Sequence, residues 1–234
     1  MVNSMMSFKG KIKEELSYYE DGLIKERKFT RNGTNEGEYT SYFGNGQVMV
    51  RLHFANGLRE GEAVSYYESG QIREKGYYKK DALEGEYIVY YENGRINEIE
   101  NYRDGKLEGQ YTSFYTISQM KDVEHFRNGK FHGEYISYYK NGQISEKGCF
   151  IDDKRDGEYI AYFRDGRIRE RAIFRNGKPE GEFLSIQSES GETSDGVENG
   201  QPSVHGLDDL NVKEKKIDEL LQGLRAFEKG HREE

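Results

Sequence analysis

Acidic side chains that could bind a metal ion or transfer protons recur at regular intervals along the chain. If each interval holds one β-hairpin, neighbouring carboxylates lie two strands apart, about 9–10 Å. That separation is too large for two of them to share a metal ion or a proton, so we expect each to hydrogen-bond a neighbouring Ser or Tyr. The members of this acidic row are Glu26, Glu74, Glu98, Asp122, Glu146 and Glu170.

The other reactive side chains also lack the arrangement that a catalytic site needs. None of the five histidines has the spacing of metal ligands. Cys149 is the single cysteine, and its repeat position is filled elsewhere by Tyr77 and Ile173, so we interpret it as a small structural filler. The sequence contains no phosphate loop, metal motif or nucleophile motif. We therefore predict no enzymatic activity, no catalytic or metal-binding residues and no cofactor.

A 24-residue repeat positions these side chains. A degenerate copy starts at Lys13, and half a copy starts at Gly181. A fixed period of this size indicates a repeat architecture, in which each unit packs only against its neighbours. Between these ends, copies of equal length start at Gly37, Gly61, Gly85, Gly109, Gly133 and Gly157.

Within each unit, side chains alternate with period two, which is typical of strands. Asn141-Gly142 favours a type I′ hairpin turn, because both residues tolerate positive φ. A second set of such dipeptides, for example Asn128-Gly129, closes the other end of the units. We therefore predict an all-β fold, an elongated antiparallel β-meander of about seven consecutive β-hairpin repeats in a single-layer twisted sheet, followed by a C-terminal amphipathic helix.

The position of the turn in each hairpin determines which side chains pair across the strands, and so assigns them to the two faces of the sheet. With Asn141 and Gly142 at the centre of the turn, Tyr139 lies opposite Ile144 on the first face, which we interpret as the packed face. The second face has two readings: Lys and Arg stems lying over Tyr rings in solvent, or a protein-binding surface. The candidate partner-binding residues on it are Tyr42, Tyr66, Tyr90, Tyr138, Tyr162, Arg51, Lys75, Lys147 and Arg171.

The fifth unit departs from the pattern. Where other units place Asn-Gly it has the segment 115–119, Tyr-Thr-Ile-Ser-Gln, in which no residue favours positive φ. Either the hairpin turn is rebuilt, or the loop leaves the row and faces a partner.

The pattern Tyr-Tyr-x-Asn-Gly-x-Ile, followed by Asn-Gly-Lys-x-x-Gly-Glu-Tyr, resembles the MORN repeat in its bacterial variant form, as in the YwqK family of antitoxin or immunity proteins. The resemblance covers residues 13–187. The usual repeat places Trp or Tyr on the first strand, whereas this chain has Tyr or Phe and no Trp. The resemblance implies a non-catalytic binding sheet that neutralises a toxin. Other MORN proteins are membrane-associated or cytoskeletal scaffolds.

Composition and charge limit the partners. Residues 188–234 hold 12 acidic and 6 basic side chains, so they carry −6 of the net charge of −8, and the repeats are close to neutral. We therefore expect no nucleic-acid partner and no membrane partner. The single cysteine and the absence of a signal-like apolar run predict a cytoplasmic protein.

Beyond the repeats the pattern changes twice. We divide the chain into a cap segment 1–12, the repeat array 13–187, a flexible acidic linker 188–206 and an amphipathic helix 207–230. This helix covers the sheet, self-associates, or docks another protein. Its candidate docking residues are Leu210, Ile217, Leu221, Leu224 and Phe227.

Two functions follow from this reading. The first is a protein-binding repeat module of the antitoxin or immunity kind, which occludes a partner toxin. The alternative is a scaffold or adaptor that organises protein partners or a membrane-associated assembly through the same sheet.

Overall fold

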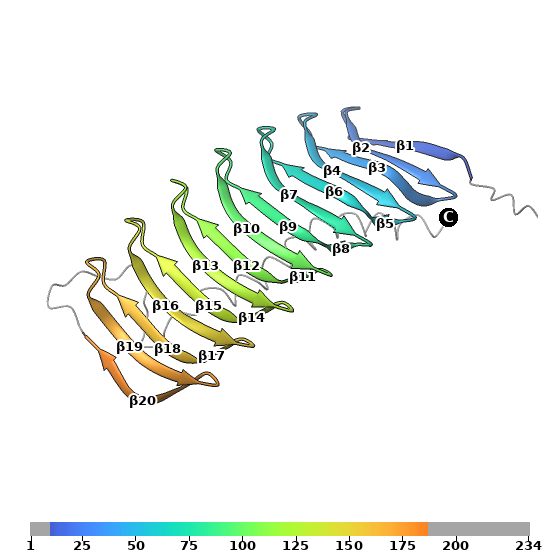
Figure 1. The fold of residues 1–234 in the computed structure, drawn as a ribbon. Helices are drawn as coiled ribbons and strands as arrows, with labels where there is room; N and C mark the ends of the chain where they lie inside the picture. The colour runs from blue at the N-terminus through green and yellow to red at the C-terminus, as the bar shows by residue number, and fades with distance from the viewer. Residues whose placement is uncertain (1–9, 187–234) are drawn as a thin grey trace, which may run out of the picture. The chain divides into compact units, whose positions relative to one another are not determined.

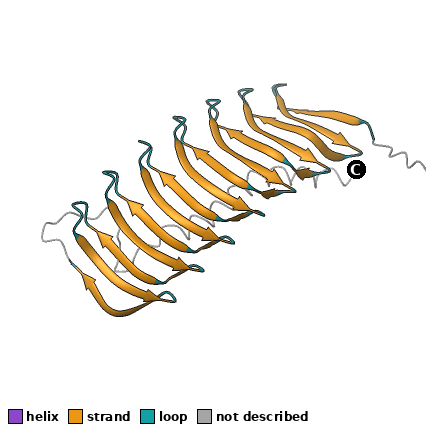
Figure 2. Cartoon of the chain, in the orientation of Figure 1, coloured by secondary structure: helices purple, strands orange, loops and turns teal. Residues whose placement is uncertain are grey.

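A computed structural model describes residues 10–186 of the chain, and these residues form one antiparallel β-sheet (Figures 1 and 2). The predicted all-β meander is confirmed. The predicted helix 207–230 and linker 188–206 lie outside the described residues. Within residues 10–186 there is no helix long and apolar enough to cross a membrane.

The sheet contains 20 strands, and they pair in chain order. Those of the first half are β1 (Ile12–Tyr18), β2 (Ile24–Arg31), β3 (Thr34–Tyr42), β4 (Val48–Ala55), β5 (Leu58–Arg59), β6 (Gly61–Tyr66), β7 (Ile72–Lys79), β8 (Ala82–Leu83), β9 (Gly85–Tyr90) and β10 (Ile96–Arg103). Those of the second half are β11 (Lys106–Leu107), β12 (Gly109–Phe114), β13 (Met120–Arg127), β14 (Lys130–Phe131), β15 (Gly133–Tyr138), β16 (Ile144–Ile151), β17 (Lys154–Arg155), β18 (Gly157–Tyr162), β19 (Ile168–Arg175) and β20 (Lys178–Ser185).

Five of these strands are two-residue pieces. Each is separated by one residue from the six-residue strand that follows, and both pieces pair with the same preceding strand, as β5 and β6 do with β4. The 20 strands therefore form 15 strand lines (20 − 5), side by side in a single twisted layer (Figure 1). A glycine with positive φ, such as Gly133 at 118°, lies at each break and forms a bulge.

Tight two-residue turns close one end of the hairpins. At Asn128-Gly129 both residues have positive φ, 53° and 80°, and the flanking Arg127 and Lys130 are paired, as a type I′ turn requires. The predicted turn type is confirmed at this end. Lys80-Asp81 and Asp152-Asp153 adopt the same positive-φ conformation without glycine, and the sequence did not single out these two turns.

The turns at the other end differ from the prediction. The N–H of Gly142 donates to the carbonyl of Tyr139, 2.8 Å away, and Gly142 has a φ of 82°, whereas Asn141 is not among the residues with positive φ. Lys140 and Asn141 are therefore the central residues of a type I turn, and Gly142 takes the left-handed position after it. The predicted type I′ turn at Asn141-Gly142 is wrong.

This longer turn changes the register beside it. Ser137 pairs with Glu146, but Tyr138, not Tyr139, pairs with Ile144, because a bulge lies between Ser137 and Tyr138. The same shift occurs in the equivalent hairpins. The predicted pair of Tyr139 and Ile144 is therefore wrong.

The fifth unit keeps the common turn. The N–H of Ser118 donates to the carbonyl of Tyr115, 2.8 Å away, and Ser118 takes a φ of 66° where other units have glycine. The N–H of Tyr115 donates to the carbonyl of Gln119, as the equivalent groups do elsewhere. The turn is therefore rebuilt, and the loop does not leave the row.

The core lies on the first face, where aromatic side chains from successive hairpins meet. Tyr135 is 6% exposed, and its ring centroid lies 5.1 Å from that of Phe150. A Cβ at Gly148 would lie 2.7 Å from the Tyr135 ring, so glycine leaves the space that this ring fills. The guanidinium of Arg155 lies 4.5 Å from the Tyr159 ring centroid and covers it.

Candidate binding surface

Four members of the acidic row on the first face, Glu26, Glu74, Asp122 and Glu146, accept hydrogen bonds from Ser or Tyr hydroxyls, as predicted. The hydroxyl of Tyr87 donates to Glu74 at 2.8 Å, and that of Tyr159 donates to Glu146 at 3.0 Å. Burial raises the pKa of both tyrosines far above its usual range, and the carboxylates raise it further. These hydroxyls therefore stay protonated and serve as hydrogen-bond donors.

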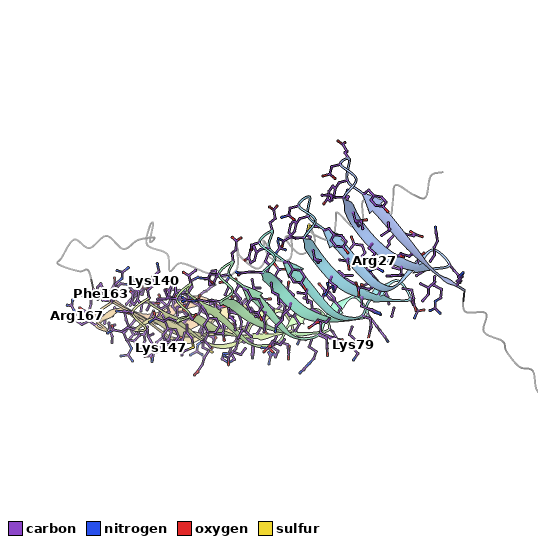
Figure 3. The ribbon with its side chains drawn as sticks, turned by 90° about the horizontal axis from the view of Figure 1, so that it is seen from above. Arg27, Lys79, Lys140, Lys147, Phe163 and Arg167 are labelled. Atoms are coloured by element: carbon purple, nitrogen blue, oxygen red, sulfur yellow. The ribbon has the colours of Figure 1, made fainter. Side chains whose placement is uncertain are left out.

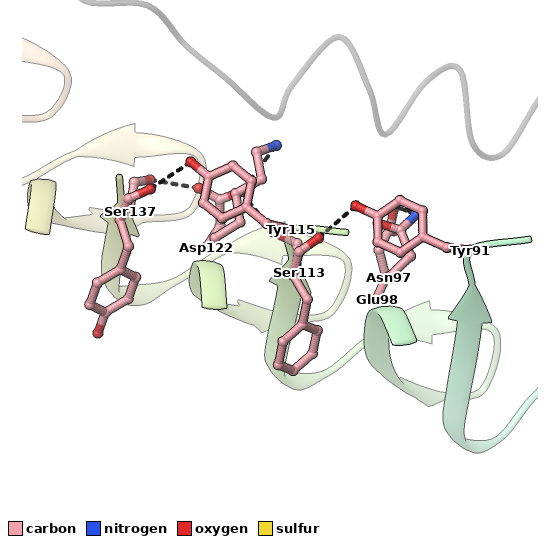
Figure 4. Close-up of polar contacts among 10 residues, drawn as sticks. Tyr91, Asn97, Glu98, Ser113, Tyr115, Asp122 and Ser137 are labelled. Atoms are coloured by element: carbon pink, nitrogen blue, oxygen red, sulfur yellow. Dashed lines mark hydrogen bonds and ion pairs between the residues drawn. The ribbon is translucent and has the colours of Figure 1, made fainter. Parts of the chain in front are cut away.

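Asp122 differs from the glutamates of its row. It accepts hydrogen bonds from Ser113 at 2.7 Å and from Ser137 at 2.8 Å, so it joins two successive hairpins (Figure 4). The equivalent tyrosine, Tyr135, has a buried hydroxyl with no hydrogen-bond partner among the described residues. The shorter aspartate is held between the two serines, which explains why it does not accept a hydrogen bond from the Tyr135 hydroxyl.

The remaining reactive side chains are dispersed along the sheet. Burial raises the pKa of the Cys149 thiol, and Glu134 and Asp156 raise it further, which favours the unreactive neutral thiol. Among residues 10–186, no group of three or more His, Cys, Asp and Glu side chains could hold a metal ion.

The second face carries the predicted partner-binding residues. The tyrosines Tyr42, Tyr66, Tyr90, Tyr138 and Tyr162 are all half-buried, whereas Arg51 and Arg171 are exposed. Side chains stand off both sides of the sheet, and no second layer of described residues covers either side (Figure 3). This face is therefore open to a partner over residues 10–186.

The backbone pairing aligns one row of this face across the whole sheet. Arg51 pairs with Val64, Val64 with Lys75, and Lys75 with Ile88. The cross-sheet row, defined by such successive pairs, consists of Leu16, Arg27, Thr40, Arg51, Val64, Lys75, Ile88, Ile99, Thr112, Val123, Ile136, Lys147, Ile160, Arg171 and Leu184. The four predicted basic residues all belong to it.

Some bases of this row contact neighbours on the same face. Arg27 is paired with Glu14 at 2.7 Å, and Arg171 is paired with Glu158. The Lys75 ammonium lies 5.8 Å from the centroid of the Tyr90 ring. The expected stacking of bases on tyrosine rings is therefore present at Lys75.

Two members of the cross-sheet row were missed by sequence reasoning. Ile99 and Val123 occupy the positions that hold Arg or Lys in the units on either side. Aligning the units at their common period would have revealed both, because each lies one full period from the base of an adjacent unit. The predicted helix-docking residues Leu210, Ile217, Leu221, Leu224 and Phe227 lie outside the described residues.

Comparison with known families supports the repeat assignment. The protein-family model described as "MORN repeat variant" matches residues 35–56, 59–80, 83–104 and 131–152. The matches follow the period of the sequence, with one unit left out before the last match, and each contains one turn of the Asn141-Gly142 kind. The unit that contains Ser118 lies between the last two matches.

Comparisons with individual proteins add little. The search of curated proteins finds no match. One solved structure with similarity is titled "Crystal structure of GtfA/B complex bound to UDP and GlcNAc", at 14% identity and a TM-score of 0.20, over 56% of this chain and 23% of that one. The chain thus spans less than a quarter of that protein, and a TM-score this low carries no argument about fold or function. Four segments of the chain therefore match the MORN repeat variant, and they lie within the array of regularly repeated hairpins.

Proposed function

We propose that this protein is a non-catalytic protein-binding module that covers the functional surface of a partner, as an antitoxin or immunity protein covers a toxin. The observation that carries the proposal is the second face, where half-buried tyrosines flank a continuous cross-sheet row of basic and apolar side chains. Tyr and Arg are enriched among the residues that dominate binding energy in protein interfaces.

The charge pattern supports a protein partner. On the second face, Glu14 and Glu158 pair with Arg27 and Arg171, so acids accompany the bases. A nucleic-acid surface needs an excess of positive charge, which this face does not have. A protein surface with both charge signs suits such a face, because complementary charges set orientation and partner choice.

The sheet also suits binding by occlusion. Every strand line is hydrogen-bonded to its neighbours, so the face is held in place before a partner arrives. Such preorganisation lowers the entropic cost of association. We place the protein in the cytoplasm, with Cys149 as the support, because a single unpaired thiol suits a reducing compartment.

The test begins with the full-length protein as bait in native lysate. Partners are identified by mass spectrometry, and the purified partner is assayed for its own activity with increasing amounts of this protein. We expect one stoichiometric partner whose activity falls to background at a 1:1 ratio. Full partner activity at saturation would contradict occlusion, and simultaneous binding of several partners would favour a scaffold.

A variant of the C-terminal segment serves as the matched control. In the full chain, Leu221→Lys with Leu224→Lys changes two of the predicted helix-docking residues and leaves the sheet intact. We expect this variant to capture the partner as well as the unmodified protein does. Loss of capture would assign binding to the C-terminal segment instead of the sheet.

A further inference from the structure

The cross-sheet row loses its charge in the middle of the sheet. Arg51 and Lys75 precede this region, and Lys147 and Arg171 follow it, but the two positions between them hold Ile99 and Val123. The neighbouring row changes at the same place, because Gln110 stands where the adjacent units have a glutamate. The charge is therefore removed from both rows within adjoining hairpins.

The result is a strip without charged side chains, which we call the central strip. Its members Ile88, Ile99, Thr112, Val123 and Ile136 are successive backbone partners. Ile88 and Thr112 are buried, at 8% and 7% exposure, whereas Ile99, Val123 and Ile136 are half-buried and supply the accessible apolar surface of the strip. Partly accessible apolar surface with a polar rim is typical of a protein interaction site.

A lysine stands at each end of the central strip. Lys75 pairs with Ile88, and Lys147 pairs with Ile136. Within the described residues neither lysine is in an ion pair, in contrast to Arg27 and Arg171. Six strand steps separate the two lysines, which corresponds to about 29 Å at the usual strand spacing. The strip therefore offers an apolar centre with an unpaired positive charge at each end.

We infer that the central strip is the docking site for an amphipathic helix of the partner protein, with a carboxylate near each end of that helix. This inference rests on the proposed function and names the chemistry of the partner. A helix satisfies its own backbone hydrogen bonds and can therefore lie on a sheet face, whereas an extended peptide would leave its backbone groups unpaired there. A helix of about 19 residues spans about 29 Å, so its two ends reach Lys75 and Lys147.

The probe is a synthetic helical peptide of about 19 residues, with Leu at i, i+3, i+4 and i+7 spacing and two Glu at each end. A second peptide has Lys in place of those Glu residues. Binding to the full-length protein is measured by fluorescence anisotropy. We expect the Glu-ended peptide to bind and the Lys-ended peptide to bind about tenfold more weakly, because the terminal charges then repel Lys75 and Lys147.

Two variants locate the site. Ile99→Lys with Val123→Lys restores the bases that the other units carry and should weaken binding of the Glu-ended peptide about tenfold, because a buried charge would lack a partner. Val64→Lys is the matched control, since it lies in the same row outside the strip. Lys75→Glu with Lys147→Glu should reverse the preference, so that the Lys-ended peptide binds better. Far-UV circular dichroism and a thermal melt check that each variant is folded.

Three results would overturn the inference. The first is equal binding of both peptides, and the second is unchanged binding by the Ile99→Lys/Val123→Lys variant. The third is displacement of the probe by a peptide of residues 207–230 with the same sensitivity to these substitutions, which would make this chain's own C-terminal segment the occupant. If the Ile99→Lys/Val123→Lys variant still captures the lysate partner, the central strip is not the docking site, while the proposed function stands. If no stoichiometric partner is captured at all, the proposed function fails independently of the peptide result.

Discussion

The hydroxyl of Tyr115 donates a hydrogen bond to the backbone carbonyl of Tyr138, 2.7 Å away, and joins one repeat to the next (Figure 4). The same bond to the residue 23 positions later is made by Tyr19, Tyr67, Tyr91 and Tyr139. Phe43 and Phe163 occupy the equivalent positions without a hydroxyl. A ladder of tyrosine hydroxyls therefore connects most neighbouring hairpins at the end of the sheet that carries the type I turns.

The ladder predicts different effects for Tyr and Phe at this position. Tyr115→Phe should lower the free energy of unfolding by about 1 kcal/mol, because it removes one hydrogen bond and leaves a carbonyl without its donor. Phe163→Tyr should not destabilise the protein to this extent. Urea unfolding at neutral pH measures both variants, and equal stability of Tyr115→Phe and the unmodified protein would show that the ladder does not stabilise the sheet.

Ser118 predicts a gain in stability on substitution. It holds a φ of 66°, a left-handed conformation that other units assign to glycine. Ser118→Gly should raise the free energy of unfolding by about 1 kcal/mol, because glycine adopts this conformation without a Cβ clash. Gly142→Ser, at the equivalent position with a φ of 82°, is the matched reverse substitution and should destabilise by a similar amount. Effects of the same sign for both would contradict this account of the turn.

Tyr135 and Tyr159 should respond differently to loss of the hydroxyl. The hydroxyl of Tyr159 donates to Glu146, so Tyr159→Phe should cost about 1.5–3 kcal/mol, the range for bonds to charged groups. The Tyr135 hydroxyl is buried without a partner among the described residues, so Tyr135→Phe should be neutral or stabilising. Chemical unfolding of the two variants tests this difference, and a larger loss for Tyr135→Phe would reverse the assignment.

The buried tyrosines predict unfolding at alkaline pH. The ordinary tyrosine pKa of 10.0 applies to the unfolded chain, and burial raises the pKa of Tyr39, Tyr111 and Tyr135 well above it in the fold. Their contribution to stability is fully present below pH 10 and is lost as the pH rises above it. Each tyrosine then lowers the free energy of unfolding by about 1.4 kcal/mol per pH unit.

Urea unfolding at a series of pH values from about 8 to 11, with tyrosinate absorbance as a second signal, measures this slope. The Tyr135→Phe variant should show a shallower slope, because one buried ionisable hydroxyl is gone. Stability that stays level between pH 10 and 11 would contradict the role of burial.

Much of the fold could be predicted from the sequence, because the repeat period and the alternation of side chains both determine it. Asn128-Gly129 forms the type I′ turn that its residue types favour. Four members of the acidic row, among them Glu74 and Asp122, accept hydrogen bonds from Ser or Tyr as predicted. These features depend on local sequence, which is similar in most units.

The errors also have physical causes. Asn-Gly suits both a type I′ turn and a type I turn followed by a left-handed glycine, so Asn141-Gly142 could not be assigned from residue type alone. The strand register beyond Ser137 depends on which of these two turn types forms. Lys80-Asp81 and Asp152-Asp153 form type I′ turns because strand pairing on both sides imposes the conformation, although neither contains glycine. Ile99 and Val123 stand out only once the cross-sheet row is known.

The most direct test of the central claim compares the two faces in one experiment with the identified partner. Tyr90→Ser with Tyr138→Ser changes the second face, and Tyr91→Ser with Tyr139→Ser changes the ladder on the first face. Calorimetric titration gives the affinity, and urea unfolding gives the stability. We predict that the second-face variant loses more affinity and less stability than the ladder variant. The opposite ranking would contradict partner binding by the second face.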